Sequence, residues 1–175
     1  MITKRDSQVI NFLNQYKIAR TSTLEFLFYP SYQVAARRLS AITKSEEIKR
    51  ERDGWSSDYI YYIKKPKQIR HSLMVTDFYR EFSKLVEIKK FIIEPNLGSI
   101  RPDAIIGFIK EDQSRLVLLE VELSHKGFDA QKYDKWDWQK YFPIKPDIII
   151  ITDYKIPQLD YKTHIINTDL KDIII

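Results

Sequence analysis

Three short helical patterns, followed at once by a strand–turn–strand pattern, occupy residues 1 to about 65, and this order restricts the fold more than any other feature of the chain. Thr3 or Asp6 can cap a first helix, in which apolar residues recur at helical spacing. Residues 21–23 can cap a second helix, which ends before Pro30 because the residue preceding a proline disfavours the helical conformation. These patterns predict a small unit of closely connected helices.

A third helix is predicted over residues 31–44, with Ser31 as its cap. This helix is amphipathic, and the side chains directed mainly outward are Gln33, Arg37, Arg38 and Lys44. A strand over residues 48–52, a turn over residues 53–58 and a return strand over residues 59–63 then predict a β-hairpin. Helices and a hairpin in this order are typical of a winged helix-turn-helix domain, which we assign to residues 1–66.

The positive charge of the chain is concentrated in the same segment. Residues 1–70 contain 14 Lys and Arg against 7 Asp and Glu, a net charge of +7, so the remaining residues carry −2 of the total of +5. A basic surface attracts polyanions such as nucleic acid. The charge distribution therefore favours the N-terminal segment as the part that binds double-stranded DNA.

The resemblance to winged-helix DNA-binding domains implies that the third helix enters the major groove and that the hairpin lies near the backbone or the minor groove. The side chains expected to contact DNA are Tyr32, Gln33, Arg37, Arg38, Lys44, Lys49, Arg50, Arg52 and Trp55. Two alternatives remain open: the basic helix is only solvated, or the domain mediates protein contacts.

Residues 67–175 show the pattern of a second, α/β domain, so the predicted fold class of the whole chain is α+β. Its expected order is helix, three strands, helix and strand, over residues 69–86, 87–93, 100–109, 115–123, 126–142 and 146–152, with a further strand possible at 164–166. The helix at 126–142 is rich in aromatic residues, which form either core or an interface, so it is a candidate dimer surface.

Three carboxylates occupy strand positions at which they can meet. Asp103 lies at the start of the second strand, and Glu120 and Glu122 alternate onto one face of the third. Carboxylates that converge inside an apolar sheet repel one another unless a divalent cation or a basic group neutralises them. The sequence therefore indicates that either a divalent cation or a basic group lies beside these three carboxylates.

This arrangement resembles the PD-(D/E)xK nuclease-like fold, with its αβββαβ core. Pro102-Asp103 matches one motif element, and residues 120–122 match the other except that Glu122 replaces the lysine. For an active nuclease, the resemblance implies that Asp103 and Glu120 hold Mg²⁺ while Glu122 or Lys132 positions or deprotonates water. In the alternative interpretation the domain is a platform that does not cleave, and no cofactor is expected.

The two segments together resemble the replication-relaxation family of plasmids, phages and other mobile elements. The elements that carry the resemblance are the winged helix, His71-Ser72-Leu73 opening a long helix, residues 101–104 (RPDA), Glu120-x-Glu122, and Lys132-Tyr133. The resemblance implies a role in plasmid replication control, relaxosome assembly or regulation, with replication or relaxosome proteins as partners.

We therefore expect a non-enzymatic DNA-binding accessory protein of a mobile element that acts as a homodimer. Two alternatives stay open: a Mg²⁺-dependent endonuclease that uses Asp103, Glu120 and Glu122, and a transcriptional repressor. The lack of a signal-peptide core and of a long apolar run predicts a cytoplasmic protein, associated with the nucleoid or a plasmid and not with a membrane. The absence of cysteine excludes disulfides and thiolate chemistry.

Overall fold

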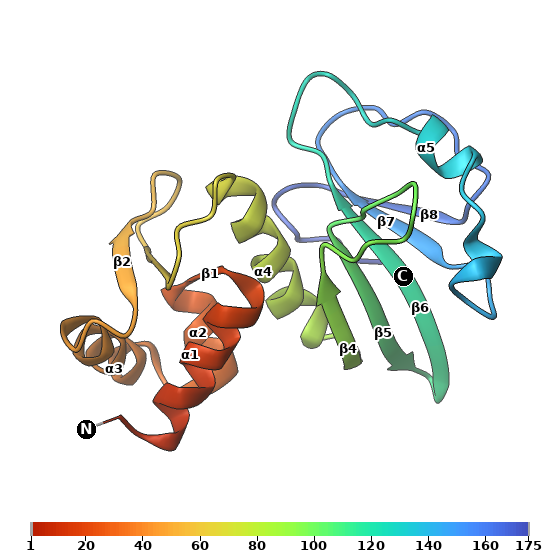
Figure 1. Ribbon diagram of the computed structural model, residues 1–175. Coiled ribbons are helices and arrows are strands. Elements are labelled where there is room, and N and C mark those ends of the chain that lie inside the picture. The colour runs from red at the N-terminus through yellow and green to blue at the C-terminus, as the bar shows by residue number, and fades with distance from the viewer. Residues whose placement is uncertain (1, 175) are drawn as a thin grey trace. The chain divides into compact units, whose positions relative to one another are not determined.

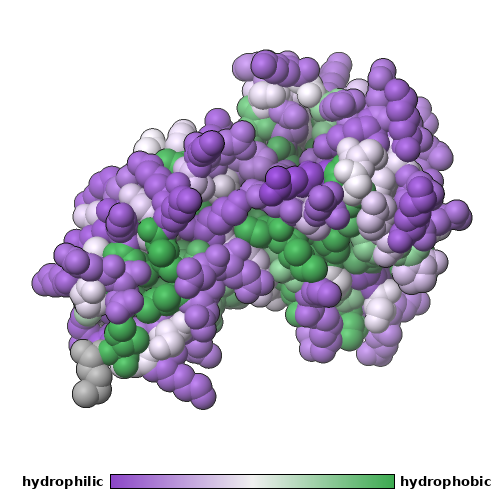
Figure 2. Space-filling view, viewed as in Figure 1, coloured by the Kyte–Doolittle hydropathy of each residue, from purple (hydrophilic) through white to green (hydrophobic). Residues whose placement is uncertain are grey.

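The computed structural model describes residues 2–174, and it confirms a mixed α+β protein. The chain forms two compact units, Met1–Arg80 and Glu81–Ile175, each with its own sheet (Figure 1). On the face shown in Figure 2, hydrophilic side chains cover much of each unit, and apolar residues are visible between them. Among the described residues, none of the helices combines the length and the apolar character that a membrane span requires.

The first unit contains the three predicted helices and the predicted hairpin. Its elements are α1 (Lys4–Tyr16), β1 (Ile18–Arg20), α2 (Thr21–Phe28), α3 (Tyr32–Lys44), β2 (Lys49–Arg52) and β3 (Tyr59–Tyr62). The expected caps of α1 and α3 are confirmed: Thr3 and Asp6 form a reciprocal capping box, and the Ser31 side chain accepts a hydrogen bond from the backbone of Val34.

Strand β1 was not predicted, because three residues are too few to show a period in the sequence. It pairs antiparallel with β3, so the hairpin becomes a three-stranded sheet of order β1-β3-β2. Ile18 of β1, together with Ile60 and Tyr62 of β3, packs against Leu73 in a buried cluster.

Leu73 lies on α4 (Ile69–Ser83), and the contacts of this helix move the boundary between the units. The sequence pattern placed the boundary at residues 66 and 67 and gave the whole helix to the second domain. In the structure, the residues of α4 up to Arg80 belong to the first unit, where Tyr79 packs against the rings of Phe12 and Tyr16. The amphipathic pattern identified the helix, but it does not show which sheet the helix covers.

The second unit is built on a five-stranded mixed sheet whose strands follow chain order. These are β4 (Glu87–Ile93), β5 (Ala104–Lys110), β6 (Gln113–Val121), β7 (Asp147–Ile151) and β8 (Thr163–Ile166). The first three are antiparallel, whereas β6, β7 and β8 run parallel. The first four strands were predicted in this chain order and the fifth was given as possible. The apolar β7 lies next to the centre of the sheet, with its isoleucines fully buried.

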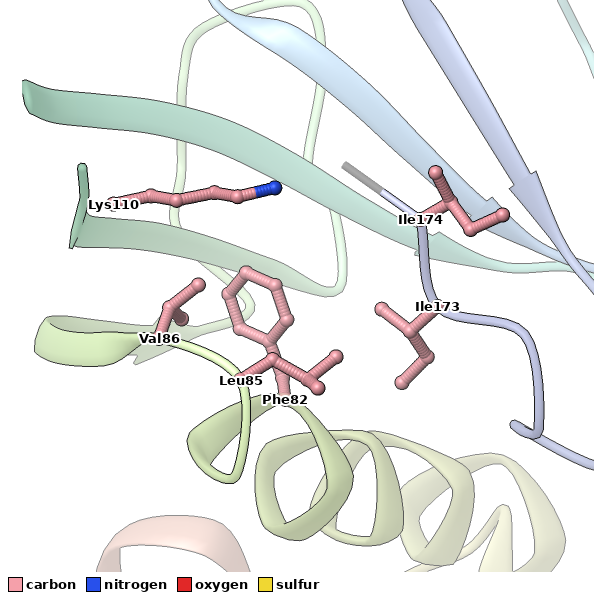
Figure 3. Close-up of a pocket in the computed structure, with 6 residues that line it drawn as sticks. All are labelled: Phe82, Leu85, Val86, Lys110, Ile173 and Ile174. Atoms are coloured by element: carbon pink, nitrogen blue, oxygen red, sulfur yellow. The ribbon is translucent and has the colours of Figure 1, made fainter.

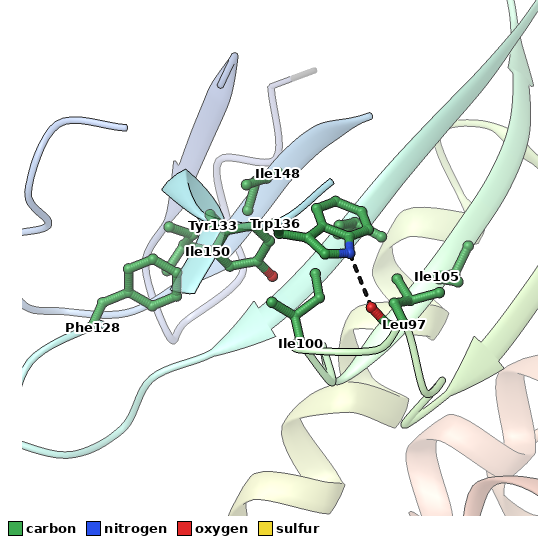
Figure 4. Packing of buried hydrophobic residues seen from close by; sticks show 9 residues of the cluster. Leu97, Ile100, Ile105, Phe128, Tyr133, Trp136, Ile148 and Ile150 are labelled. Carbon is green, nitrogen blue, oxygen red and sulfur yellow. Dashed lines mark hydrogen bonds between the residues drawn. The ribbon is translucent and has the colours of Figure 1, made fainter. Parts of the chain in front are cut away.

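The helix predicted over residues 126–142 is wrong. Only α5 (Gln131–Asp134) and the 3-10 turn η1 (Trp138–Lys140) are helical there, and Gly127 adopts a positive φ of 84° that interrupts a helix. Phe128, Tyr133 and Trp136 instead pack on the sheet in one buried cluster (Figure 4). On a continuous helix at 3.6 residues per turn, these aromatic side chains and Phe142, which packs beside them, would spread over about half of the circumference and could not all reach one core.

This burial also changes the interpretation of the segment as a dimer surface. Tyr133 is fully buried and Trp136 is 5% exposed, and the Trp136 Nε1 donates a hydrogen bond to the carbonyl oxygen of Leu97 at 3.0 Å (Figure 4). These two aromatic residues are therefore core, the other of the two roles that the sequence allowed.

Candidate functional site

In the first unit, α3 and β2 both carry exposed basic side chains, and we call these two elements together the basic face. On α3 the side chains of Gln33, Arg37 and Lys44 are exposed, as are Lys49, Arg50 and Arg52 on β2. The guanidinium groups of Arg50 and Arg52 lie over the Tyr59 ring, with centroid distances of 4.8 and 4.2 Å. Cation–π contacts of this kind orient an arginine without removing its charge.

Arg38 differs from the other basic residues of α3, and the prediction that it points outward is wrong. Its guanidinium forms an ion pair with the fully buried carboxylate of Asp6, so it connects α3 to the first turn of α1. Burial alone would raise the pKa of Asp6, but hydrogen bonds from Arg38 and Thr3 lower it to about 2. Helical periodicity placed Arg38 near the edge of the outward side, and a partner 32 residues away leaves no local signal.

A second network of buried charge holds the hairpin turn. The carboxylate of Asp53 accepts hydrogen bonds from Arg20 Nε and Ser56 Oγ, both at 2.6 Å, and from the Trp55 amide at 3.1 Å. Burial alone would raise the pKa of Asp53, but these donors lower it. The same arginine pairs with Asp77 of α4, so one guanidinium connects the turn, the sheet and the helix.

The turn is also attached to the helices. Asp58, the last residue before β3, accepts hydrogen bonds from the Tyr32 hydroxyl of α3 and from the Ser22 amide of α2, each at 3.3 Å. Trp55, which lies in the turn, is 57% exposed. The structure therefore brings Tyr32 and Trp55 from the predicted DNA contacts into one connected region, in which Asp58 binds Tyr32 and the turn carries Trp55.

In the second unit, Asp103, Glu120 and Lys132 surround the end of β6, and we call them the carboxylate–lysine cluster. The Asp103 carboxylate accepts a hydrogen bond from the Val121 amide at 2.6 Å, and the Asp103 amide donates to the Leu119 carbonyl oxygen at 2.9 Å. Glu120 is 7% exposed, and Lys132 Nζ lies 2.8 Å from its Oε1 atom. The Tyr133 hydroxyl donates a hydrogen bond to the same oxygen.

Burial raises the pKa of Glu120, although Lys132 and Tyr133 oppose the shift, and the nearby charge of Asp103 adds to it. Burial and the neighbouring carboxylate of Glu120 also raise the pKa of the Tyr133 hydroxyl, which therefore stays a donor. The cluster thus contains a buried carboxylate whose loss of hydration is only partly offset by Lys132 and Tyr133. Carboxylates with a raised pKa of this kind are common at functional sites.

Glu122 does not join this cluster in the way the strand alternation predicted. Strand β6 ends at Val121, and the Glu122 carboxylate accepts hydrogen bonds from the amide and the hydroxyl of Ser124, at 2.8 and 2.5 Å. Within residues 2–174, no group of three or more His, Cys, Asp and Glu side chains is arranged to hold a metal ion. The expected convergence of three carboxylates is therefore wrong, and the cation beside Glu120 is Lys132.

Comparisons of the chain with family models, with curated proteins and with solved structures find no match. Its function is therefore inferred from the residues and contacts described above.

Proposed function

We propose that this chain is a DNA-binding accessory or regulatory protein of a plasmid or other mobile element. In this proposal the first unit is a winged helix-turn-helix, with α3 as its recognition helix and the β2–β3 hairpin as its wing. The element order α1-β1-α2-α3-β2-β3 and the small antiparallel sheet support that assignment.

The observation that carries the proposal is that three acidic side chains of this unit are buried against arginines, whereas most basic side chains of α3 and β2 are exposed. Asp6, Asp53 and Asp77 are buried, and each pairs with the side chain of Arg38 or Arg20. The basic face on α3 and β2 is left exposed to solvent. Exposed cations on a helix and on the strand that follows it fit the phosphates that flank a DNA groove.

The proposed role in a plasmid or other mobile element says in which process the DNA binding is used. It is supported by the likeness of the sequence to the replication-relaxation family, and it gives the second unit the role of a platform for dimerisation or for replication and relaxosome proteins. Winged-helix proteins commonly bind symmetric sites as pairs, so we include a homodimer. Transcriptional repression uses the same DNA contacts and differs only in the site that is bound.

Substitution of Arg37 tests the DNA-binding proposal. Arg37 is exposed on α3, so Arg37→Ala should weaken duplex affinity about tenfold and reduce the salt dependence of binding by about one phosphate contact. Arg70→Ala is the matched control, since it removes the same charge from an exposed helical position outside the basic face. Footprinting of bound sites on a plasmid would identify the target. Equal affinities for the parent and Arg37→Ala would contradict the recognition-helix assignment.

A second candidate function is Mg²⁺-dependent cleavage of DNA, and the carboxylate–lysine cluster favours it. The strand order β4-β5-β6-β7 supports a PD-(D/E)xK-like core with this cluster at the motif positions. Asp103 and Glu120 would hold Mg²⁺, which would supply charge stabilisation at the phosphate. After leaving Glu120, Lys132 would position water as an ammonium, or would deprotonate it once the ammonium has lost its own proton to solvent.

Plasmid nicking in Mg²⁺ or Mn²⁺ tests the second candidate. Asp103→Ala and Glu120→Gln should abolish nicking, whereas Glu122→Gln should retain it because the Glu122 side chain is bound to Ser124. Absence of nicking by the parent over a wide range of protein concentration would leave the second unit as a platform.

A further inference from the structure

Trp55 is the most exposed large apolar side chain among the described residues of the first unit, with 57% of its surface accessible. It lies in the turn between β2 and β3, beside the exposed cations of β2. An indole in water has a large apolar surface that gains free energy when another molecule covers it. Its position raises the question of which ligand covers it.

The turn that carries Trp55 is held in a defined conformation. The Asp53 amide donates to the Asp58 carbonyl oxygen at 3.0 Å and closes the turn. The Asp53 carboxylate binds the Trp55 amide from inside, and Arg52 Nη1 donates to the Ser57 carbonyl oxygen at 3.0 Å. A ligand that stacks on Trp55 therefore meets a side chain whose backbone is already ordered, which lowers the entropic cost of binding.

The same contacts fix the turn relative to α3, because Asp58 also binds the Tyr32 hydroxyl. A DNA duplex held by α3 would therefore bring a particular part of the nucleic acid to Trp55. Arg52 at the base of the turn would attract the phosphates beside that part. The indole adds no positive charge, so its contribution differs from that of the basic residues.

We propose that Trp55 is a stacking site for an unpaired base, so that the hairpin recognises DNA in which a duplex adjoins unpaired or unstacked nucleotides. The inference rests on the proposed DNA binding and names the kind of DNA that is bound. In an intact duplex both faces of a base are covered by its neighbours, whereas an unpaired base has a free face for an aromatic side chain. Contact with phosphates alone does not require an indole.

The test compares two DNA probes that differ in one feature. One is a mixed-sequence duplex, and the other is the same duplex with a short unpaired bulge, each measured by fluorescence anisotropy with the full chain at low salt. The parent should bind the bulged duplex more tightly. Trp55→Ala should lose about tenfold in affinity for the bulged duplex, the size expected of one base–aromatic stack, and a clearly smaller factor for the intact duplex.

Two further variants separate stacking from other effects. Trp55→Phe keeps an aromatic ring and should retain most of the preference for the bulged duplex, whereas Arg37→Ala should weaken binding to both probes equally. A 2-aminopurine placed in the bulge should be quenched by the parent and not by Trp55→Ala. Because Trp55 is exposed, Trp55→Ala should unfold at the same temperature as the parent, which would show that the fold is intact.

The outcomes distinguish this inference from the function on which it rests. If the parent binds neither probe, the proposed DNA binding fails and the inference fails with it. If the parent binds both probes equally, or Trp55→Ala weakens both to the same extent, DNA binding stands but the stacking site is overturned. A selective loss on the bulged duplex, with quenching abolished, supports the stacking site.

Discussion

The two units treat their buried carboxylates differently. In the first unit, Asp6 and Asp53 each receive hydrogen bonds from an arginine and from nearby backbone and hydroxyl donors, and the pKa of each carboxyl is lowered. In the second unit, Glu120 receives one ion pair and one hydroxyl hydrogen bond, and its pKa is raised. Burial opposes ionisation of all three carboxyl groups. The number and the strength of the hydrogen-bond donors therefore decide whether the pKa of each group is lowered or raised.

This difference suggests different uses for the two kinds of group. A carboxylate whose loss of hydration is fully offset by hydrogen bonds and an ion pair stays bound to its partner. We call such a group a brace when it connects two elements, as Asp6 connects α1 and α3. A carboxylate with incomplete compensation releases its partner or takes up a proton at a lower cost, which suits chemistry or exchange of partners. The contrast can be tested with three predictions.

The largest effect should come from removing a brace. Asp6→Ala deletes both the Arg38 ion pair and half of the α1 capping box, so the free energy of unfolding should fall by about 3 kcal/mol in a denaturant titration. Asp172→Ala, at an exposed position, is the matched control and should change it little. A loss no larger than that of the control would show that Asp6 is not a brace.

Acid should produce the next largest effect, through the same residue. The pKa of Asp6 falls from 3.8 to about 2 on folding, so the unfolded chain binds more protons between these values. The stability that Asp6 contributes is complete above pH 4 and is lost as the pH falls to 2, a change of about 2 kcal/mol. Hydrogen exchange at amides of α1 and α3 would measure it. Asp6→Asn should be less sensitive over this range, and an unchanged pH profile in that variant would contradict the prediction.

The smallest effect, with the opposite sign, is expected at Glu120. Because its pKa is raised on folding, its stabilising contribution is present below the unfolded pKa and is lost as the pH rises through the folded one. Glu120→Gln should therefore change the stability at neutral pH by no more than about 1 kcal/mol and should remove that loss with rising pH. Hydrogen exchange of β6 and β7 amides against pH would report it. A stability in the variant that still falls over the same pH range would mean that Glu120 is not the group that titrates.

Much of the fold could be predicted because its signals are local. The caps at Thr3 and Ser31, the apolar periodicity of α1 and α3 and the alternation along the hairpin each lie within one element. The strands of the second unit were predicted in chain order from their apolar runs, among which β7 is almost wholly apolar, but their order within the sheet was not predicted. The exposed cations of α3 were predicted for the same reason, since the apolar stripe of the helix fixes its opposite side.

The errors share a different cause, which is dependence on tertiary partners. Arg38 binds a carboxylate 32 residues away, so no window of the sequence shows that it is paired inside the fold. The segment 126–142 has a composition typical of helices, but its aromatic side chains pack individually against residues of the sheet. The Glu122 carboxylate instead binds the amide and the hydroxyl of Ser124, a contact that the alternation along β6 does not reveal.

Strand β2 has one further consequence. In the sheet order β1-β3-β2 it is an edge strand, and its four residues are Lys49, Arg50, Glu51 and Arg52. An open edge can pair with the edge of another molecule and begin aggregation, and a row of charged side chains opposes such pairing. The cations of β2 that we expect to meet DNA therefore also oppose pairing of this edge with another molecule. Variants that remove them should be made with glutamate or glutamine and not with apolar residues. An apolar edge strand would favour aggregation, and the aggregation would be mistaken for a loss of DNA binding.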